Sequence, residues 1–518
     1  ARKNVLQIKL PIPPQGWQQK PAGISLCMIV KNEERFLDQC LRSVARVVDE
    51  INVVDTGSTD ATIDIARAHG ARIEHRAWRN DFSWARNEAL SMATKRWVLV
   101  LDADEVLSTA AAETLAALRD VPAYLQGLWI RCKNYEDTSR GSEGLVNAIV
   151  RVFPSHERIR FRNTIHEFIS LDDDPQGMPA SDSPIEIIHY GYTREVMAER
   201  GKLQRNLDIC RDEAMANPDD AFAWYNLGMT AMLAGDRTVA LEALEKMRSL
   251  LSGSVKAYLP HGLAALAELY LQTGTPHIAL RISEECIAAA PTFPNAHFTH
   301  GKVLVALGRL HDARDSFGEA IAAGEHAHEH HVIDPDVPAW KAQNEIGATL
   351  MTERRYDFAL KWFELGLENR QNAQPLQLNR ARALELLGQR AEAEAAFERA
   401  YYEFRDNLST TEYVNFLLRH DRNDQALTII DQASSYLDAE SKVKFLGSAA
   451  MLGLRASDEP SAIAYLRRAL EVTPEAAEFL ETLFAHFGDP VAQHVMRRVC
   501  DDYRSSKSSG LRLNTALA

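Results

Sequence analysis

The stretch WVLVLDADE, residues 97–105, decides the fold prediction, because its apolar run ends abruptly at two carboxylates one residue apart. The run predicts a buried strand that delivers Asp102 and Asp104 to the edge of a sheet. In an extended backbone, residues two apart project from the same side, so we expect both carboxylates to face one ligand. Such a pair suits Mg²⁺ or Mn²⁺ and, through the cation, a diphosphate. The alternative is a turn, since acidic residues often end a strand without binding anything.

Strand and helix patterns alternate upstream of this stretch. Apolar runs predict strands over residues 24–30, 50–54 and 71–75, and helical patterns fill residues 35–47 and 61–69 between them. Polar loops follow the strands, as in IVKNEE and VVDTGSTD. This order is typical of a parallel sheet, whose ligands gather at the carboxyl ends of its strands. We therefore expect these loops to meet the two carboxylates at one edge of the sheet.

Four motifs in this order and spacing, IVKNEE, VVDTGSTD, FSWARNEAL and LVLDADE, resemble those of family 2 glycosyltransferases of the GT-A fold. The resemblance covers residues 22–200. It implies an α/β, Rossmann-like domain that binds a nucleotide sugar and transfers the sugar from a nucleoside diphosphate. It also implies a divalent metal, Mn²⁺ or Mg²⁺, and inversion at the anomeric carbon. A lone DXD motif is weakly specific, whereas four motifs in register are a strong signal.

The resemblance places three residues around the nucleoside. Asp55 lies where the family uses a carboxylate against the uracil or ribose, and an acceptor-only group suits base N–H groups and sugar hydroxyls. Asn32 and Glu33 lie in the loop that the family places around the nucleoside, although both equally suit the start of a helix. Thr59 or Asp60 is expected to cap the next helix rather than to bind a ligand.

The motif FSWARNEAL predicts a helix that borders the donor diphosphate. Its apolar stripe is expected to face the sheet and consists of Phe82, Ala85 and Ala89. Arg86 lies off this stripe, and a guanidinium binds phosphate bidentately, so Arg86 is the expected phosphate ligand. A surface salt bridge to Glu88 or Asp81 is the alternative.

The step Asp102-Ala103-Asp104 corresponds to the DXD motif of the family. Asp104 is the expected metal ligand, Asp102 should lie near the ribose or the metal, and all three residues should border the donor. His189 or His166 is expected to complete the metal site, because many GT-A enzymes add a histidine from this later region and imidazole suits Mn²⁺. For each histidine, a hydrogen-bonded structural role is the alternative.

The region after the DXD motif should supply the acceptor half of the domain. Its pattern predicts a helix over residues 109–119 and strands over 127–132, 148–153 and 185–192, with FRNTIHEF (161–168) before the last strand. Many family members carry an acidic pair at the start of a helix in this region and use one carboxylate as the base. Here the pair Glu136-Asp137 falls in a predicted loop with no helix after it.

Inverting transfer needs a base that takes the acceptor proton. Glu167 is the predicted catalytic base, because it follows His166 in an R-V-F…H-E…H-Y-G-Y pattern that resembles transferases fused to helical repeats. The weaker alternatives are the loop carboxylates of Glu136, Asp137 and Glu143, since loops often order over a bound donor.

Beyond residue 200 the period changes. Small residues recur at spacings of 39, 34, 46, 34, 33 and 36, at Ala240, Ala279, Ala313, Ala359, Ala393, Ala426 and Ala462. These spacings are close to the 34-residue period of tetratricopeptide (TPR) repeats and predict about seven units. Phe317, Phe363 and Phe397 follow their alanines by four residues and should fill the space between neighbouring units. The longest spacing contains EHAHEHHVIDP, whose four histidines lack a metal-site framework.

An all-α TPR solenoid presents a surface suited to extended polypeptide. Joined to a sugar-transfer domain, it favours a protein or peptide acceptor modified on a hydroxyl or thiol. In the alternative, the acceptor is a cell-surface polysaccharide or another non-protein molecule, and the repeats dock a partner or associate with a second copy. A third interpretation, a scaffold with a degenerate transferase domain, is disfavoured by the intact motifs.

Composition is that of a modular globular chain of 518 residues, with 46% hydrophobic residues and a net charge of −14. The charge argues against nucleic acid, since phosphate binding needs a basic surface. No apolar run approaches a membrane span, and the six cysteines show no pairing pattern, which favours reduced thiols and a cytoplasmic location. We expect an extended arm over residues 1–21, the transferase domain over 22–200, the repeats over 201–500 and a mobile polar tail over 501–518.

Overall fold

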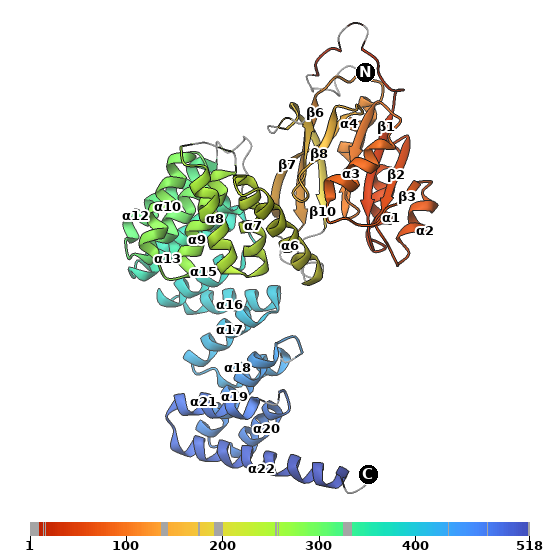
Figure 1. Ribbon diagram of the computed structural model, residues 1–518. Coiled ribbons are helices and arrows are strands. Elements are labelled where there is room, and N and C mark those ends of the chain that lie inside the picture. Colours follow the sequence, from red (N-terminus) through yellow and green to blue (C-terminus); the bar gives the residue numbers. More distant parts are fainter. Residues whose placement is uncertain are drawn as a thin grey trace. The chain divides into compact units, whose positions relative to one another are not determined.

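The structure is a computed structural model that divides into two compact units, Ala1–Ile346 and Gly347–Ala518 (Figure 1). The first unit holds a mixed α/β domain and the first helices of an all-helical region, and the second unit holds the remaining helices. The residues that the structure describes are 10–13, 15, 17–135, 143–172, 174, 177–190, 200–253, 256, 258–324, 334–433, 435–473 and 475–515.

An eight-stranded sheet forms the N-terminal domain, in the order β3-β2-β1-β4-β7-β6-β10-β5. Its first half is parallel, as predicted, and consists of β3 (Arg72–His75), β2 (Glu50–Asp55), β1 (Ile24–Val30) and β4 (Trp97–Val100). Its second half is mixed and consists of β7 (Glu143–Pro154), β6 (Gly127–Tyr135), β10 (Ala180–His189) and β5 (Glu105–Leu107). Here β7 runs antiparallel to both β4 and β6, and β5 runs antiparallel to β10.

Helices cover both faces of the sheet because successive strand residues point to opposite sides. Leu26 of β1 packs in one core with Leu41 of α1 (Leu37–Val44) and Leu115 of α4 (Thr109–Leu118). The neighbouring Cys27 packs in another core with Ala89 of α3 (Phe82–Ser91). The helix α2 (Thr62–Ala68) contributes to the first core. The strand ends between these helices are therefore free to carry the motif loops.

Several element boundaries differ from the prediction. The first helix is shorter than residues 35–47, and β6, β7 and β10 each extend beyond the predicted strands. Gly191 and Tyr192, expected at the end of the last strand, lie outside the described residues. The segment FRNTIHEF was given no strands, yet its ends belong to an antiparallel hairpin of β8 (Ile159–Arg162) and β9 (Phe168–Leu171).

The chain after the sheet domain is helical wherever it is described, beginning with α6 (Arg200–Ala216). Helix pairs follow in the first unit and into the second: α7 (Ala221–Ala234) with α8 (Arg237–Leu250), α9 (Leu259–Gln272) with α10 (Pro276–Ala289), α11 (Pro294–Ala306) with α12 (Leu310–Gly324), and α13 (Ala342–Thr352) with α14 (Tyr356–Asn369). The short π-helix η2 (Val337–Lys341) precedes α13. The later pairs are α15 (Gln374–Leu386) with α16 (Arg390–Phe404), α17 (Asn407–Arg419) with α18 (Asn423–Ala433), α19 (Ala439–Arg455) with α20 (Glu459–Leu470), and α21 (Ala476–Phe487) with α22 (Pro490–Thr515).

The period read from the sequence matches these pairs. All seven predicted alanines lie in the second helix of a pair and are fully buried. Phe317, Phe363 and Phe397 are fully buried as well. The pair α21 and α22 comes after the last predicted alanine. The segment predicted as a mobile polar tail, 501–518, continues α22 as a helix as far as Thr515.

Glycines allow the paired helices to cross closely. A Cβ atom added to Gly228 of α7 would lie 2.6 Å from Cγ of Leu244 in α8, which is less than carbon atoms tolerate. A Cβ atom at Gly301 of α11 would meet the ring of Phe317 in α12. Phe317 therefore fills the space that Gly301 leaves within its own helix pair, whereas the sequence predicted that it would fill the space between units.

The sheet domain and the first helices share one apolar core. Trp78 and Phe82 pack against a cluster that contains Ile165 of the sheet domain and Leu207 of α6. All six cysteines are free and buried. In the described part of the chain, every helix is too short or too polar to cross a bilayer.

Candidate active site

A cavity of about 580 Å³ opens at the carboxyl ends of β1, β2 and β4. The motif loops and α6 contribute to its wall. Its lining residues are Ile29, Val30, Lys31, Asn32, Glu33, Thr56, Trp78, Phe82, Arg86, Asp102, Ala103, Asp104, Ile165, His166, Glu167, His189, Arg205 and Asn206. A second cavity of about 620 Å³, beside the N-terminal segment and β8, contains none of the predicted site residues. The first cavity is therefore the candidate active site.

The Asp102-Ala103-Asp104 step is a turn, which corrects the expectation of an extended backbone. The strand β4 ends at Val100, and Glu105 N donates to Asp102 O at 3.1 Å. Asp102 N in turn donates to Glu105 Oε2 at 2.8 Å. These two bonds close the turn before β5 begins. Asp102 and Asp104 nevertheless line the same cavity.

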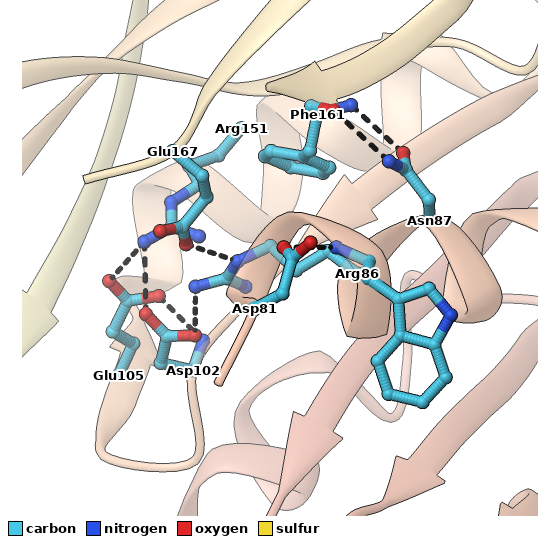
Figure 2. A network of polar contacts seen from close by, with 9 residues as sticks. Asp81, Arg86, Asn87, Asp102, Glu105, Arg151, Phe161 and Glu167 are labelled. Carbon is cyan, nitrogen blue, oxygen red and sulfur yellow. Dashed lines mark hydrogen bonds and ion pairs between the residues drawn. The ribbon is translucent and has the colours of Figure 1, made fainter. Parts of the chain in front are cut away.

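Two arginines hold the carboxylate of Asp102 (Figure 2). Arg86 Nη2 donates to Asp102 Oδ1 at 2.8 Å, and Arg151 Nη2 donates to Asp102 Oδ2 at 3.0 Å. Burial alone would raise the pKa of Asp102, but the two guanidinium groups outweigh it and hold that pKa well below its ordinary value. Asp102 is therefore an ionised carboxylate with both oxygens already engaged.

Arg86 is buried, which the helical stripe did not predict. Only 5% of its surface is exposed, and Phe82 packs against the helical region instead of the sheet alone. The Nε atom of Arg86 donates to Glu167, and the guanidinium of Arg86 lies over the ring of Phe161 at 5.5 Å (Figure 2). The remaining nitrogen, Nη1, is buried and has no hydrogen-bond partner among the described residues. The salt bridge to Glu88 or Asp81 is absent among the described contacts, because Asp81 caps α3 and Glu88 binds Arg76.

Glu105 and Arg151 belong to the site, and neither was predicted. Glu105 is 2% exposed and lies 3.5 Å from Arg151 Nη2. Burial raises the pKa of Glu105 to about 7, with Arg151 opposing the shift and Asp102 adding to it. The sequence signal for Arg151 was its place in the RVF run, a charge inside an apolar strand. In a buried strand such a charge requires a partner.

Asp104 and His189 face each other across the end of the sheet. His189 Nε2 lies 3.4 Å from Asp104 Oδ2, and Tyr190 N donates to Asp104 O at 2.9 Å. Burial opposes protonation of His189, but the carboxylates of Asp104, Glu105 and Asp102 outweigh it and raise its pKa. Two ligands of one Mg²⁺-sized cation at about 2.1 Å lie about 3 Å apart when adjacent, so the pair fits such a cation. No third His, Cys, Asp or Glu of the described chain joins it within ligand distance.

The nucleoside loops are tied to each other. Asn32, with a left-handed φ of 56°, accepts from Thr59 N at 2.8 Å, and its own N–H donates to Ser58 Oγ at 3.0 Å. Glu33 N donates to Thr62 Oγ1 at 2.7 Å. Asn32 and Glu33 line the cavity, so the structure gives them both a structural contact and access to a ligand.

Asp55 lies at the end of β2 but does not line the cavity. It is 3% exposed and accepts from Ser58 N at 3.0 Å and from His75 Nδ1 at 3.0 Å. Burial raises its pKa, and these hydrogen bonds outweigh burial and lower it. Asp60 accepts from Thr62 N at 3.0 Å, but the N-cap position of α2 is Ala61, so the expectation that Thr59 or Asp60 occupies it is wrong.

Glu167 and His166 lie on the turn between β8 and β9, which the helical region supports. Phe82 N donates to Thr164 O at 2.8 Å, and Thr164 Oγ1 donates to Glu213 of α6 at 2.7 Å. His166 Nε2 lies 3.4 Å from Thr230 Oγ1 of α7, and burial lowers the pKa of His166 while Glu167 opposes the shift. The structure brings Glu167 to the DXD turn through Arg86 and directs His166 toward the helices.

Other predicted residues cannot be placed. Glu136, Asp137 and the four histidines of EHAHEHH lie outside the described residues. The backbone of Glu143 begins β7, but its side chain is not described.

Residues 25–169 match the glycosyl transferase family 2. Over 312 residues, the chain is 32% identical to a TPR repeat-containing protein of Synechococcus elongatus, a match that covers 52% of this chain and 76% of that protein. The chain is a family 2 glycosyltransferase with TPR repeats. The predictions of the family, of the GT-A-like α/β domain followed by helical repeats, and of an enzyme are confirmed.

Other relatives of this family 2 glycosyltransferase match shorter stretches. The SPbeta prophage-derived glycosyltransferase SunS of Bacillus subtilis is 26% identical over 240 residues, which cover 45% of this chain and 54% of SunS. An uncharacterized glycosyltransferase of Rickettsia typhi is 41% identical over 85 residues, or 16% of this chain and 29% of that protein. The match to the solved structure of a tetratricopeptide repeat protein of Parabacteroides merdae covers 50% of this chain and 97% of that chain, at 15% identity and a TM-score of 0.36.

Proposed function

We propose that this family 2 glycosyltransferase moves a sugar from a UDP-hexose or UDP-N-acetylhexosamine to a protein or peptide side chain, with Mn²⁺ or Mg²⁺ bound at Asp104 and His189. The nucleotide-sugar donor follows from the family. The observation that carries the metal assignment is the distance of 3.4 Å between Asp104 Oδ2 and His189 Nε2 at the wall of the cavity.

The ligand set suits a hard cation. One carboxylate oxygen and one imidazole nitrogen are ordinary ligands for Mn²⁺, and the diphosphate and water would supply the rest. When bound, the cation neutralises the charge that develops on the leaving diphosphate. In this proposal Asp102 orients the site instead of binding metal directly, because its two oxygens already accept from Arg86 and Arg151.

Glu167 is the proposed base. One of its oxygens accepts from Arg86 Nε, and within the described chain the other oxygen has no hydrogen-bond partner. The side chain is 13% exposed and lines the cavity, so an acceptor hydroxyl or thiol can reach it. The contact with Arg86 fixes the carboxylate in place, as a positioned base requires.

The repeats support a polypeptide acceptor. The helical region follows the transferase domain in the same chain, and its first helix supplies Arg205 and Asn206 to the cavity wall. A molecule that leaves the cavity along α6 therefore meets helical repeats, which commonly bind extended peptides. Self-association of the repeats is the competing use of that surface.

The test combines the full chain, MnCl₂, a panel of nucleotide sugars and a peptide library, with mass spectrometry of the products. We expect one UDP-sugar to add its hexose or N-acetylhexosamine mass to peptide, and Asp104→Ala to abolish the transfer. Asp64→Ala is the matched control, because that carboxylate is 83% exposed on α2 and lies outside the cavity. Absence of both transfer and hydrolysis with every donor would refute the proposal. Transfer to a glycan but to no peptide would replace the acceptor by the non-protein alternative.

A further inference from the structure

The wall of the active-site cavity includes two residues of the helical region. Arg205 and Asn206 of α6 line the same cavity as Asp104 and His189. The sequence motifs of the transferase domain end before α6, so none of them assigns these two residues a role. They lie within the first compact unit, where the sheet domain and α6 share a core.

The cations nearest the DXD turn are already neutralised by the protein. Arg86 binds Asp102 and Glu167, and Arg151 binds Asp102 and Glu105. Those arginines stabilise fixed carboxylates, and their charge is largely offset before any ligand arrives. Besides the divalent cation of the proposed function, a diphosphate that enters the cavity therefore gains little positive charge from these two arginines.

Among the residues that the structure describes, the guanidinium of Arg205 has no carboxylate partner. Its Nε and Nη2 donate to Asn206 Oδ1 at 3.3 and 3.1 Å, and its guanidinium lies over the ring of Phe82 at 5.5 Å. No carboxylate of the described chain lies within ion-pair distance of it, and burial lowers its pKa. A partly desolvated cation of this kind gains free energy when an anion binds.

The surroundings of Arg205 favour phosphate as that anion. Asn206 and Phe82 fix the orientation of the planar fork, which matches the spacing of two phosphate oxygens. The other cavity cation without a carboxylate partner among the described residues is Lys31, an exposed residue at the end of β1, on the side of the nucleoside loops. Arg205 instead lies on the wall formed by α6.

We propose that Arg205, from the first helix of the repeat region, binds the diphosphate of the nucleotide-sugar donor and that Asn206 positions its guanidinium. The proposal rests on the proposed function, because it places the donor in this cavity. It follows that the donor site of this glycosyltransferase is incomplete without α6.

Calorimetric titration of the full chain tests this role. UDP and inorganic pyrophosphate, each with MnCl₂, are titrated into the wild type, Arg205→Ala and Arg205→Lys. We expect Arg205→Ala to weaken the binding of both ligands by about tenfold or more, since hydrogen bonds to a charged group are lost. Arg205→Lys should restore part of the affinity, because it keeps the charge without the fork. Pyrophosphate makes the result independent of the nucleobase.

Arg211→Ala is the matched control on the same helix. Its side chain is 43% exposed, pairs with Asp208 and does not line the cavity, so we expect wild-type affinity. If Arg205→Ala melts below the wild type, Arg205→Gln replaces it, because glutamine keeps part of the stem that packs on Phe82.

Failure of the proposed function and failure of the role of Arg205 give different results. If the wild type binds neither UDP nor pyrophosphate, the proposed function is wrong, and so is the proposal that Arg205 binds the diphosphate. If the wild type binds both and the Arg205 variants bind them equally well, the proposed function stands and the role of Arg205 is overturned. An equal loss in Arg211→Ala would also overturn it, since a general effect of charge on α6 would then explain the data.

Discussion

Arg151 Nη2 lies 3.0 Å from Asp102 Oδ2, the carboxylate oxygen that Arg86 does not bind. The two arginines come from α3 and β7, so the first carboxylate of the DXD turn is fixed by elements on both sides of it in the sequence. Figure 2 shows Asp102 between them, with Glu105 on the Arg151 side. Each oxygen of the Asp102 carboxylate is therefore held by a different arginine.

Arg151→Gln should destabilise the protein by about 3 kcal/mol or more. The substitution leaves Glu105 buried beside the negative charge of Asp102 without its cation, and an uncompensated buried charge is costly. Urea unfolding measures the loss. Arg131→Gln is the control, since Arg131 is exposed on the neighbouring strand β6. Equal stability of the two variants would show that the network does not hold the fold together.

Asp104→Asn and His189→Ala should each weaken the binding of Mn²⁺ in the presence of UDP by about tenfold, because each removes one of two protein ligands. Because both side chains are largely buried, at 22% and 20% exposed, thermal unfolding of each variant separates a loss of the ion from a loss of the fold. Mn²⁺ titration followed by electron paramagnetic resonance measures the affinity. Asp64→Asn should bind the ion like the wild type, and a loss in that variant alone would point to a different metal site.

Glu105→Gln should change how stability depends on pH. Burial raises the pKa of Glu105 to about 7 from an ordinary 4.5, so the folded protein favours the neutral carboxyl. The stability that this preference contributes is complete below the ordinary pKa and is lost as the pH rises through the folded pKa. Each unit of pKa difference corresponds to about 1.4 kcal/mol.

The measurement is the free energy of unfolding of the wild type and Glu105→Gln across that pH window. The wild type should lose stability relative to the variant as the pH rises, because glutamine does not ionise and the other groups cancel in the difference. A difference that stays constant, or that grows in favour of the wild type, would contradict the raised pKa.

Gly228→Ala should destabilise the helical region by about 1–3 kcal/mol, because the added methyl group would overlap fully buried Leu244. Gly318→Ala is the matched control in α12, where a Cβ atom meets nothing within 4 Å. That variant should be unchanged or more stable by up to about 1 kcal/mol, as alanine favours a helix over glycine. Thermal unfolding compares the two, and a larger loss at Gly318 would contradict the close crossing of α7 and α8.

The parallel half of the sheet was predictable because its strands are short apolar runs with local boundaries, as in residues 24–30. The turn at Asp102 was not, because it closes through the side chain of Glu105 and through the pairing of β5 with β10, about eighty residues later. The hairpin of β8 and β9 was not predicted from the sequence, for another reason. Strands of four residues give too little alternation to separate them from a loop.

The sequence grouped several residues that line the cavity but did not predict the contacts between them, and Asp55, grouped with them, does not line it. Asp104, His189, Arg86 and Glu167 line one cavity, as the motif loops suggested. Periodicity places Arg86 on a face of α3, but it does not say which element covers that face, so its burial against Asp102 and Glu167 was not foreseen. Arg151 lies 49 residues after Asp102 and belongs to no local motif.

The repeats were predictable from their period, whereas the end of the last helix was not. The apolar side chains of α22 recur at helical spacing up to Cys500, after which serine and lysine dominate. A helix that packing has already nucleated extends through such residues at little cost, because each added residue gains one backbone hydrogen bond. Because residues 501–518 are mostly polar, their composition alone predicted a tail.

The hydrogen bond from Thr164 to Glu213 bears on how such enzymes can be recombined. A chimera spliced between β10 and α6 would separate the turn that carries Glu167 from the carboxylate that supports it, and would expose Trp78 and Phe82. A splice after α8 would keep both. The core that covers Trp78 and Phe82 continues as far as α11, so repeats exchanged beyond that point have to supply a matching apolar face, whereas α6 and α7 have to be inherited together with the transferase sheet.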